Sequence, residues 1–348
     1  MEPSAVLSPN GTVEEMCPSS NADVDLREVI TVLGFITSLV GIAFNGVSIA
    51  ALASSGKLLK KPFTVLLINL AVADLLFCAS DFSNAVIRYI CLRDPSCFGG
   101  GTGACFLYNL IMLLKGMDWW TVMLIALERY ISVCKTIYYK KLFTLKKIFA
   151  MVAGFWFLGI GLTLVPHIGQ LRDFSNFKCD TDSDDISYRR TPMASFFIAF
   201  AAVPFLVMLF CYSAIYFKLR KYSKWRAKSM KEIPSWMKKN SKDLTKTSFY
   251  VCCFYFLCVI VNCNVFLVTS FFDICRKFDD LRLISRLIFT QMFWINNFMY
   301  MFRIKAYREA YLKLFGRFKF WEPFTIKTIT LGDKNESKPT NVTPINLS

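Results

Sequence analysis

The chain has 348 residues, of which 55% are hydrophobic and only 19% are charged, and this composition excludes an intrinsically disordered protein. Its single histidine, His167, argues against His-rich metal sites and catalytic triads built on imidazole. Basic residues outnumber acidic ones by 41 to 25, which gives a formal charge of +16. In so apolar a chain, basic residues that cluster between apolar segments indicate membrane topology rather than nucleic-acid binding.

Seven apolar segments are each long enough to cross a bilayer, which takes about 20 residues of helix. None alternates with the period of a membrane β-strand, so helices are the spanning form that fits. We therefore predict an all-α membrane protein, a seven-transmembrane helix bundle over residues 29–304. The predicted helices are 29–53, 63–89, 105–134, 147–169, 192–218, 246–274 and 284–304.

The charges of the connecting segments predict the orientation of the bundle. The segments after the first, third, fifth and seventh helices, with Arg129, hold 29 basic and 7 acidic residues, a net +22. The N-terminal tail 1–28 and the other loops hold 11 basic and 16 acidic residues, a net −5. The positive-inside rule places the N-terminus outside the cell and the C-terminus in the cytoplasm of a multi-pass plasma-membrane protein. Asn10, in an Asn-Gly-Thr sequon, is then open to glycosylation.

The C-terminal part of the chain divides into two segments. Residues 305–320 intersperse basic side chains with apolar ones such as Tyr311 and Phe318, which predicts an amphipathic eighth helix on the cytoplasmic membrane surface. Residues 321–348 are polar and are predicted to form a disordered cytoplasmic tail.

Six of the predicted helices carry short motifs. They include Asn45 in the first helix, Asp74 in the second, Glu128-Arg129-Tyr130 at the end of the third, Trp156 and Pro166 in the fourth, Pro204 and Tyr212 in the fifth, and Asn296 with Tyr300 in the seventh. This ordered set resembles the rhodopsin-like (class A) G-protein-coupled receptors, and the resemblance covers about residues 29–320.

The resemblance assigns roles at the cytoplasmic end. It implies that Arg129 pairs with Glu128 in the inactive state and turns on activation toward the C-terminal helix of a G-protein α-subunit. Tyr212 and Tyr300 would then swing beneath it, and Tyr130 and Asn296 belong to the same coupling motifs. The alternative is a basic residue that snorkels to the interface.

A layer of polar residues lies in the middle of the predicted bundle. Asp74 is a carboxylate within the bilayer, and Asn45 and Asn296 are short polar residues that can satisfy it across helices. The resemblance implies an allosteric sodium ion in this layer, and the alternative is a polar packing cluster without an ion. Asp118 departs from the family, which has a small polar residue there, and puts a second carboxylate at about the same depth.

A ligand is expected between the outer halves of the helices. Lys115, an ionisable group within the third helix, is a candidate anchor for a ligand carboxylate. The alternative is an internal salt bridge to Asp118, three residues further along. The other candidate ligand-binding residues are Ile111, His167, Asn264 and Thr290, although packing or capping is the alternative for His167. Ile111 and Thr290 stand where aminergic receptors have aspartate and opsins have the retinal lysine, so both subfamilies are disfavoured.

The sixth and seventh helices depart from the family pattern. The sixth has neither the aromatic toggle nor the kink-forming proline, and Asn297 stands where the seventh usually has proline. Kinks without proline need an inserted side chain, a water molecule or a bulge. Asn262, Asn264 and Asn297 are the candidates for such a distortion.

The resemblance also implies a disulfide between Cys105 and Cys179, which would join the third helix to the second outer loop. Cys97 is an alternative to Cys105, which lies one residue later than the family's cysteine. A second bond between Cys17 and Cys275 would tie the N-terminus to the third outer loop.

These features together predict a receptor without catalytic chemistry. It would transmit the signal of an extracellular ligand, a peptide or another small ligand, to a heterotrimeric G protein by conformational change. Arrestin and receptor kinases are further expected partners, and nucleic acid is not. The alternatives are a ligand-independent receptor-like protein with an altered switch, favoured by the missing prolines, and a small-solute transporter, favoured by the ionisable residues within the bilayer.

Overall fold

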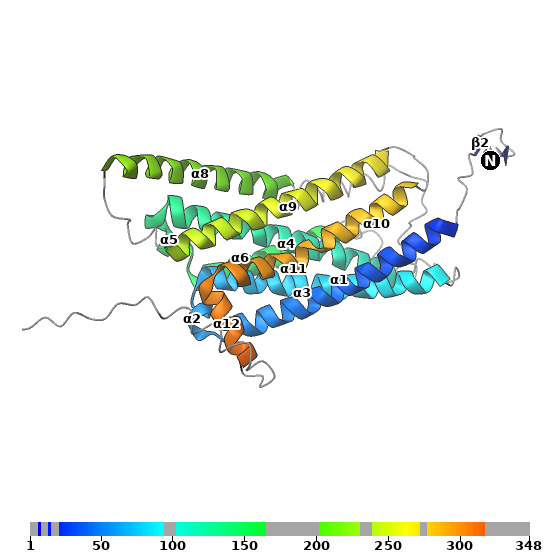
Figure 1. Cartoon of the computed structure of the whole chain (residues 1–348), viewed down its shortest axis with the longest axis horizontal. Helices are drawn as coiled ribbons and strands as arrows, with labels where there is room; N and C mark the ends of the chain where they lie inside the picture. The colour runs from blue at the N-terminus through cyan, green and yellow to red at the C-terminus, as the bar shows by residue number, and fades with distance from the viewer. Residues whose placement is uncertain are drawn as a thin grey trace, which may run out of the picture.

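The structure is a computed structural model in which long helices lie roughly side by side along one common direction (Figure 1). The described residues are 6–7, 13–14, 21–93, 102–164, 202–229, 239–271 and 277–316.

Within the described residues, seven helical segments form the bundle. They are α1 (Asn21–Ala53), α3 (Pro62–Arg93), α4 (Thr102–Cys134), α6 (Leu145–Leu164), α8 (Val203–Ser229), α9 (Lys239–Phe271), and α10 (Lys277–Thr290) with α11 (Met292–Arg303). Shorter helices are α2 (Gly56–Leu59), α5 (Thr136–Leu142) and α12 (Lys305–Gly316), and the two-residue strands β1 (Val6–Leu7) and β2 (Val13–Glu14) pair antiparallel. The all-α fold is therefore confirmed, and α12 corresponds to the predicted eighth helix.

The helices run beyond the predicted apolar segments. α1 begins at Asn21 instead of residue 29, and α8 continues to Ser229 instead of 218. An apolar window marks only the part of a helix that crosses hydrocarbon, whereas backbone hydrogen bonds continue through polar turns outside it. The predicted stretches 165–169 and 192–201 lie outside the described residues.

The seventh segment is interrupted at Gln291. Its N–H donates to the carbonyl of Ile288 at 3.2 Å, a three-residue spacing that breaks the regular α-helical ladder. The side chain of Gln291 donates to the carbonyl of Leu287 at 2.9 Å and accepts from the indole of Trp294 at 3.0 Å. The seventh segment is thus distorted without proline at Gln291, whose side chain forms hydrogen bonds within the segment. This position lies six residues before Asn297, which was one of the three candidates for such a distortion.

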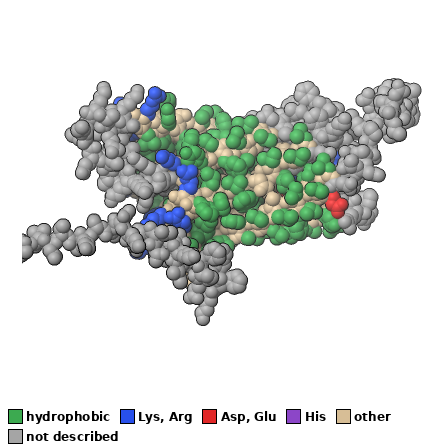
Figure 2. All heavy atoms as spheres, in the orientation of Figure 1, with side chains coloured by type: hydrophobic (Ala, Val, Ile, Leu, Met, Phe, Trp, Pro, Cys, Tyr) green, Lys and Arg blue, Asp and Glu red, His purple; other side chains and the backbone are tan. Residues whose placement is uncertain are grey.

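α1 and α3 pack closely because Gly41 has no side chain, since a Cβ at this position would overlap the Sγ of Cys78. The opposite surfaces of the helices stay apolar and exposed. Phe157, Phe210 and Phe217 are among the most exposed large side chains, and Figure 2 shows a broad hydrophobic band around the middle of the molecule. Five described helices are long and apolar enough to cross a bilayer. This band is the surface that lipid would cover.

The band is flanked by different charges at its two ends. Lys and Arg side chains gather where α2, α5 and α12 lie, and an acidic side chain is visible at the opposite end, nearer the N-terminus (Figures 1 and 2). We call the first the basic end and the second the N-terminal end. The basic end also holds Arg129.

Candidate functional site

An ion pair is buried at the basic end of α4. The guanidinium of Arg129 donates from Nε and Nη2 to the two carboxylate oxygens of Glu128. Arg129 is 4% exposed and Glu128 is fully buried. The hydroxyl of Tyr139, on α5, donates to Oε1 of the same carboxylate at 2.6 Å. This pairing agrees with the inactive arrangement that the resemblance implied, and Tyr139 is an additional partner that sequence reasoning missed.

Aromatic rings surround the pair. The Arg129 guanidinium lies 4.4 Å from the centroid of the Phe63 ring, which in turn contacts Tyr300 at 5.7 Å and Tyr307 at 6.4 Å. Tyr300 donates to the hydroxyl of Ser248 on α9 at 3.2 Å. The Arg129 guanidinium is therefore held by one carboxylate and one aromatic face. These contacts hold it more weakly than two carboxylates would.

Two tyrosines outside the membrane-spanning segments also belong to this cluster. Burial raises the pKa of Tyr307 on α12 to about 12, and its hydroxyl forms a hydrogen bond with Thr64 at 3.1 Å. Burial, then the charge of Glu128, raises the pKa of Tyr139 well above its usual value. Both hydroxyls are therefore protonated at neutral pH, as the donation from Tyr139 to Glu128 requires.

The other two tyrosines of the coupling motifs make ring contacts with residues other than Arg129. Tyr212 on α8 is buried, its ring contacts Phe249 at 5.6 Å, and its hydroxyl has no hydrogen-bond partner among the described residues. Tyr130 is half-buried against Phe210, with ring centroids 5.6 Å apart. A buried hydroxyl without a partner loses hydrogen-bond energy, so Tyr212 would gain a bond by moving.

The polar layer in the middle of the bundle differs from its prediction. Asp74 and Asp118 are fully buried and lie close enough to interact, yet their oxygens accept no hydrogen bond from the described residues. Asn45 turns away from them, donating to the carbonyl of Phe293 at 2.8 Å and accepting from the side chain of Asn297. The amide of Asn296 has no hydrogen-bond partner among these residues. Our expectation that Asn45 and Asn296 satisfy Asp74 was wrong.

Lys115 and Asp118, both on α4, do not pair with each other. Residues three apart on a helix are neighbours, and the order Lys before Asp is the less favourable one for an ion pair. The Nζ of Lys115 instead lies 4.9 Å from the centroid of the Phe289 ring on α10. Because both Asp118 oxygens are without a hydrogen-bond partner among the described residues, the alternative salt bridge is not formed.

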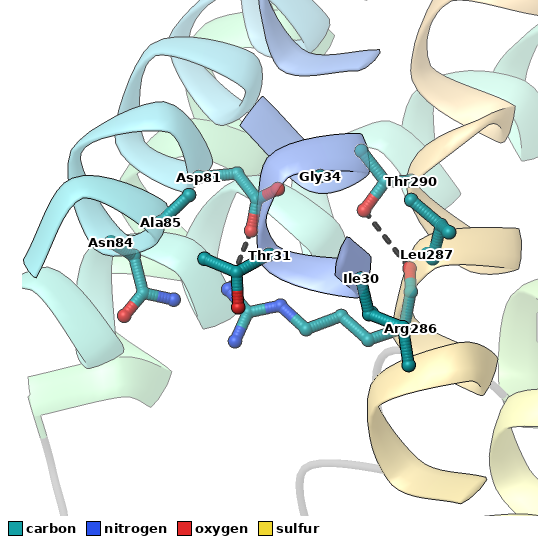
Figure 3. A pocket seen from close by; sticks show the side chains of 9 residues that line it. All are labelled: Ile30, Thr31, Gly34, Asp81, Asn84, Ala85, Arg286, Leu287 and Thr290. Carbon is teal, nitrogen blue, oxygen red and sulfur yellow. Dashed lines mark hydrogen bonds and ion pairs between the residues drawn. The ribbon is translucent and has the colours of Figure 1, made fainter. Parts of the chain in front are cut away.

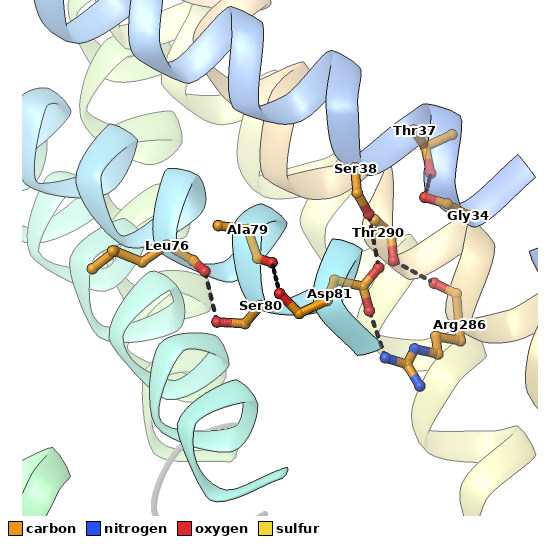
Figure 4. A network of polar contacts seen from close by, with 10 residues as sticks. Gly34, Thr37, Ser38, Leu76, Ala79, Ser80, Asp81, Arg286 and Thr290 are labelled. Atoms are coloured by element: carbon orange, nitrogen blue, oxygen red, sulfur yellow. Dashed lines mark hydrogen bonds and ion pairs between the residues drawn. The ribbon is translucent and has the colours of Figure 1, made fainter. Parts of the chain in front are cut away.

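A second ion pair lies near the N-terminal end, between α1, α3 and α10. The guanidinium of Arg286 pairs with Oδ1 of Asp81 at 2.5 Å (Figure 3), and Ser38 donates to Oδ2 at 3.1 Å (Figure 4). The Asp81 side chain is 6% exposed and that of Arg286 is 27% exposed. Asn84, with its amide oxygen turned toward Arg286, accepts a further bond from the guanidinium at 2.9 Å.

A small cavity of about 40 Å³ adjoins this pair, and Thr290 lines it while donating to the carbonyl of Arg286 at 3.0 Å (Figure 3). Sequence reasoning assigned Thr290 to the ligand pocket but did not single out Asp81, although that residue lies within the predicted helix 63–89. The missed signal was the spacing: Asp81 lies seven residues after Asp74, on the same face of α3.

The remaining predicted site residues are placed as follows. Ile111 is buried in the core, 6% exposed, and does not border the small cavity. The side chains of Asn264 and Cys105, together with His167, Cys179 and Asn10, lie outside the described residues. The cysteines described as free thiols are Cys78, Cys134, Cys211, Cys252, Cys253 and Cys258.

The arrangement agrees with what comparison with known proteins shows. Residues 44–299 match the family described as "7 transmembrane receptor (rhodopsin family)". The chain belongs to this family. Its fold matches the crystal structure of squid rhodopsin with a TM-score of 0.71 at 19% identity, covering 98% of both chains. The receptor class, and not an enzyme class, is therefore the correct one, and the receptor is a multi-pass membrane protein.

The receptor is only distantly similar to individual relatives. It is 24% identical to "G-protein coupled receptor moody" of Drosophila melanogaster over 59% of this chain and 31% of the relative. It is 25% identical to the blue-sensitive opsin of Oryzias latipes over 66% and 64%, and 24% identical to "Protein trapped in endoderm-1" of Drosophila melanogaster over 86% and 80%. The chain thus spans less than two thirds of the length of the first two relatives.

Proposed function

We propose that the receptor transmits an extracellular ligand signal to a heterotrimeric G protein in the cytoplasm. The observation that carries this proposal is the buried Glu128–Arg129 pair at the basic end. The charge difference between the two ends supports a cytoplasmic basic end and an extracellular N-terminus in the plasma membrane.

Activation in this proposal is a shift between two populations. In the described state, Arg129 is held by Glu128 and covered by Phe63, so it is withdrawn from the cytoplasm. A G protein that contacts Arg129 favours the state in which the pair is open, and an agonist that favours the same state is coupled to it by linkage. Tyr212, whose hydroxyl has no bond here among the described residues, gains one by moving toward the released guanidinium.

The proposed ligand carries a carboxylate, as a peptide or a small acid does, and Lys115 is its anchor. Lys115 is half-buried in the outer part of α4, it is not paired with Asp118, and the aromatic face of Phe289 holds its ammonium. A ligand carboxylate would give this ammonium a charge-assisted hydrogen bond, which is a stronger interaction than a cation–π contact.

Asp74 and Asp118 fit the sodium ion of the family. Their oxygens are buried together with no donor among the described residues, and a cation would screen the repulsion between the two carboxylates. Bound there, sodium would supply the positive charge that the protein does not. Arrestin and receptor kinases are proposed partners of the C-terminal tail, with the outer disulfide and the Asn10 glycan as proposed modifications.

Nucleotide exchange on a purified G protein, driven by the receptor in nanodiscs and screened against carboxylate-bearing ligands, tests the proposal. We expect a hit to raise exchange in the wild type and Arg129→Ala to abolish the increase. Lys115→Ala should weaken the response to the same ligand, whereas Lys140→Ala, an exposed control on α5, should leave its concentration dependence unchanged. Basal exchange that depends on Arg129 without any active ligand would favour a ligand-independent receptor, and solute flux in proteoliposomes would favour a transporter.

A further inference from the structure

A second and larger cavity opens at the basic end. Its volume is about 320 Å³, within the range of small-molecule sites. The cavity lies between the start of α3, the end of α4, α5 and the start of α12. Its lining residues are Lys60, Lys61, Pro62, Phe63, Arg129, Tyr139, Ile304, Ala306 and Tyr307. None of these except Arg129 belongs to the family motifs that the sequence analysis used.

The charge of the lining is positive. Arg129 is balanced by Glu128, but Lys60 and Lys61 are exposed, line the cavity and form no salt bridge among the described residues. Two lysines that line a concave site attract an anion more strongly than the same lysines on a flat surface, because the walls of the cavity focus their electric field.

Backbone donors add to this preference. α12 begins at Lys305 beside the cavity. The carbonyl of Ile304, just before the helix, accepts from the amides of Tyr307 and Arg308 at 3.0 Å each. The amides of Lys305 and Ala306 have no acceptor within α12. The positive end of the helix dipole lies at this same N-terminal end of α12. Phosphate groups are the anions that such an arrangement of lysines and amides binds best.

Aromatic side chains form part of the wall of the cavity. Phe63, Tyr139 and Tyr307 line it, and Phe63 stacks on the Arg129 guanidinium. A bound group with phosphates at the mouth and a ring of carbon atoms inside would satisfy both the lysines and these side chains. The headgroup of a phosphorylated inositol, whether on a lipid of the inner leaflet or as a free inositol phosphate, has this composition.

We propose that this cavity is a binding site for a phosphorylated inositol headgroup that holds the Glu128–Arg129 pair closed. Tyr139 is both a wall of the cavity and a hydrogen-bond donor to Glu128, so a ligand that contacts Tyr139 stabilises the arrangement of the pair. Because binding favours the state that contains the site, occupancy lowers the population of the open state. The inhibitory effect rests on the proposed coupling to a G protein, whereas the binding itself does not.

Binding is measured first, without a G protein. The full receptor in nanodiscs is titrated with a soluble inositol trisphosphate, and its thermal unfolding is compared in nanodiscs with phosphatidylinositol bisphosphate or with phosphatidylserine at equal total charge. We expect saturable binding of the soluble probe, and a higher unfolding temperature with the phosphoinositide than with phosphatidylserine. A response to the lipid alone would assign the site to a lipid headgroup, and a response to the soluble probe alone would assign it to a free inositol phosphate.

Three variants separate the site from general attraction to the basic end. Lys60→Gln with Lys61→Gln should weaken binding about thirtyfold, since each lysine near an anionic headgroup contributes about a factor of five. Ala306→Phe keeps every charge but fills the cavity, and it should abolish binding. The control is Lys140→Gln with Lys141→Gln, an exposed pair on α5 outside the cavity, which should bind like the wild type.

Equal losses in the cavity pair and the control pair would overturn the proposal, because they would show attraction to the whole surface. Unchanged binding in Ala306→Phe would overturn it as well. The closed-state effect is then tested by nucleotide exchange: added probe should reduce exchange in the wild type and not in the cavity pair. Binding without any effect on exchange would refute the coupling to Arg129 and leave the site itself established.

Discussion

The Asp81–Arg286 pair offers a direct test of the packing between α1, α3 and α10. Removing one partner of a buried ion pair costs about 3–5 kcal/mol, because the other charge is left without compensation. Here Arg286 is 27% exposed, and Asp81 keeps the Ser38 hydroxyl and borders a cavity. We therefore expect Arg286→Ala to destabilise the receptor by about 2 kcal/mol, below that range. Asp81→Asn should cost less, about 1 kcal/mol, because the exposed guanidinium reaches water.

Thermal unfolding in nanodiscs, followed with a thiol-reactive dye, measures these changes. Cys78, Cys211 and Cys252 are buried free thiols that become reactive only when the bundle opens. At about 2–4 °C per kcal/mol, Arg286→Ala should lower the unfolding temperature by about 4–8 °C. Lys305→Ala is the control, since its pair with Glu309 is 3.9 Å long and exposed on both sides, and it should change little.

The double variant gives the sharper outcome. Asp81→Asn combined with Arg286→Ala removes both charges, so no uncompensated carboxylate remains in the protein interior. We expect the double variant to unfold at a higher temperature than Arg286→Ala alone. If the two losses simply add, or if Arg286→Ala behaves like Lys305→Ala, then Asp81 is not held in a desolvated pair and the reasoning is wrong.

Three further predictions concern the basic end and the seventh segment. Glu128→Gln should raise basal nucleotide exchange by about tenfold, because it removes the charge-assisted bonds that hold Arg129, and unchanged exchange would argue against a latch. Asn297→Ala should lower the unfolding temperature by about 2–4 °C by removing its bond to α1. Tyr307 has a raised pKa of about 12, so its contribution to the free energy of unfolding is complete below pH 10 and is lost as the pH rises through 12. Tyr307→Phe should reduce this loss of stability in unfolding measured over a pH series, whereas Tyr138→Phe, on the surface, should not.

The sequence was sufficient for the features that depend on averages over many residues. The seven apolar segments predicted the bundle, and the charge of the loops separates the two ends that Figure 2 shows. The Glu128–Arg129 pair was expected from the resemblance to the receptor family, which implies it. In each case one strong physical term, burial of apolar surface or neutralisation of charge, determines the outcome.

Partner choice inside the bundle was not predictable in the same way. Asn45 has donors and an acceptor within reach of several helices, and it bonds Phe293 and Asn297 instead of Asp74. Asp81 lies within the predicted helix 63–89, but no pattern in the sequence indicates that it faces Arg286. Such choices depend on rotations of a helix by a fraction of a turn, which differ little in energy and leave no periodic signal.

The replacement of proline by Asn297 has a consequence for how the two ends communicate. Proline would have removed a backbone donor and bent the segment at that point. Asparagine instead keeps the helix regular there and adds a side-chain donor that ties α11 to Asn45 on α1. The break moves to Gln291, one residue after Thr290, which lines the small cavity beside Arg286. The joint at Gln291 therefore lies next to that cavity, and α11, a regular helix from Met292 to Arg303, connects the joint to Tyr300 at the basic end.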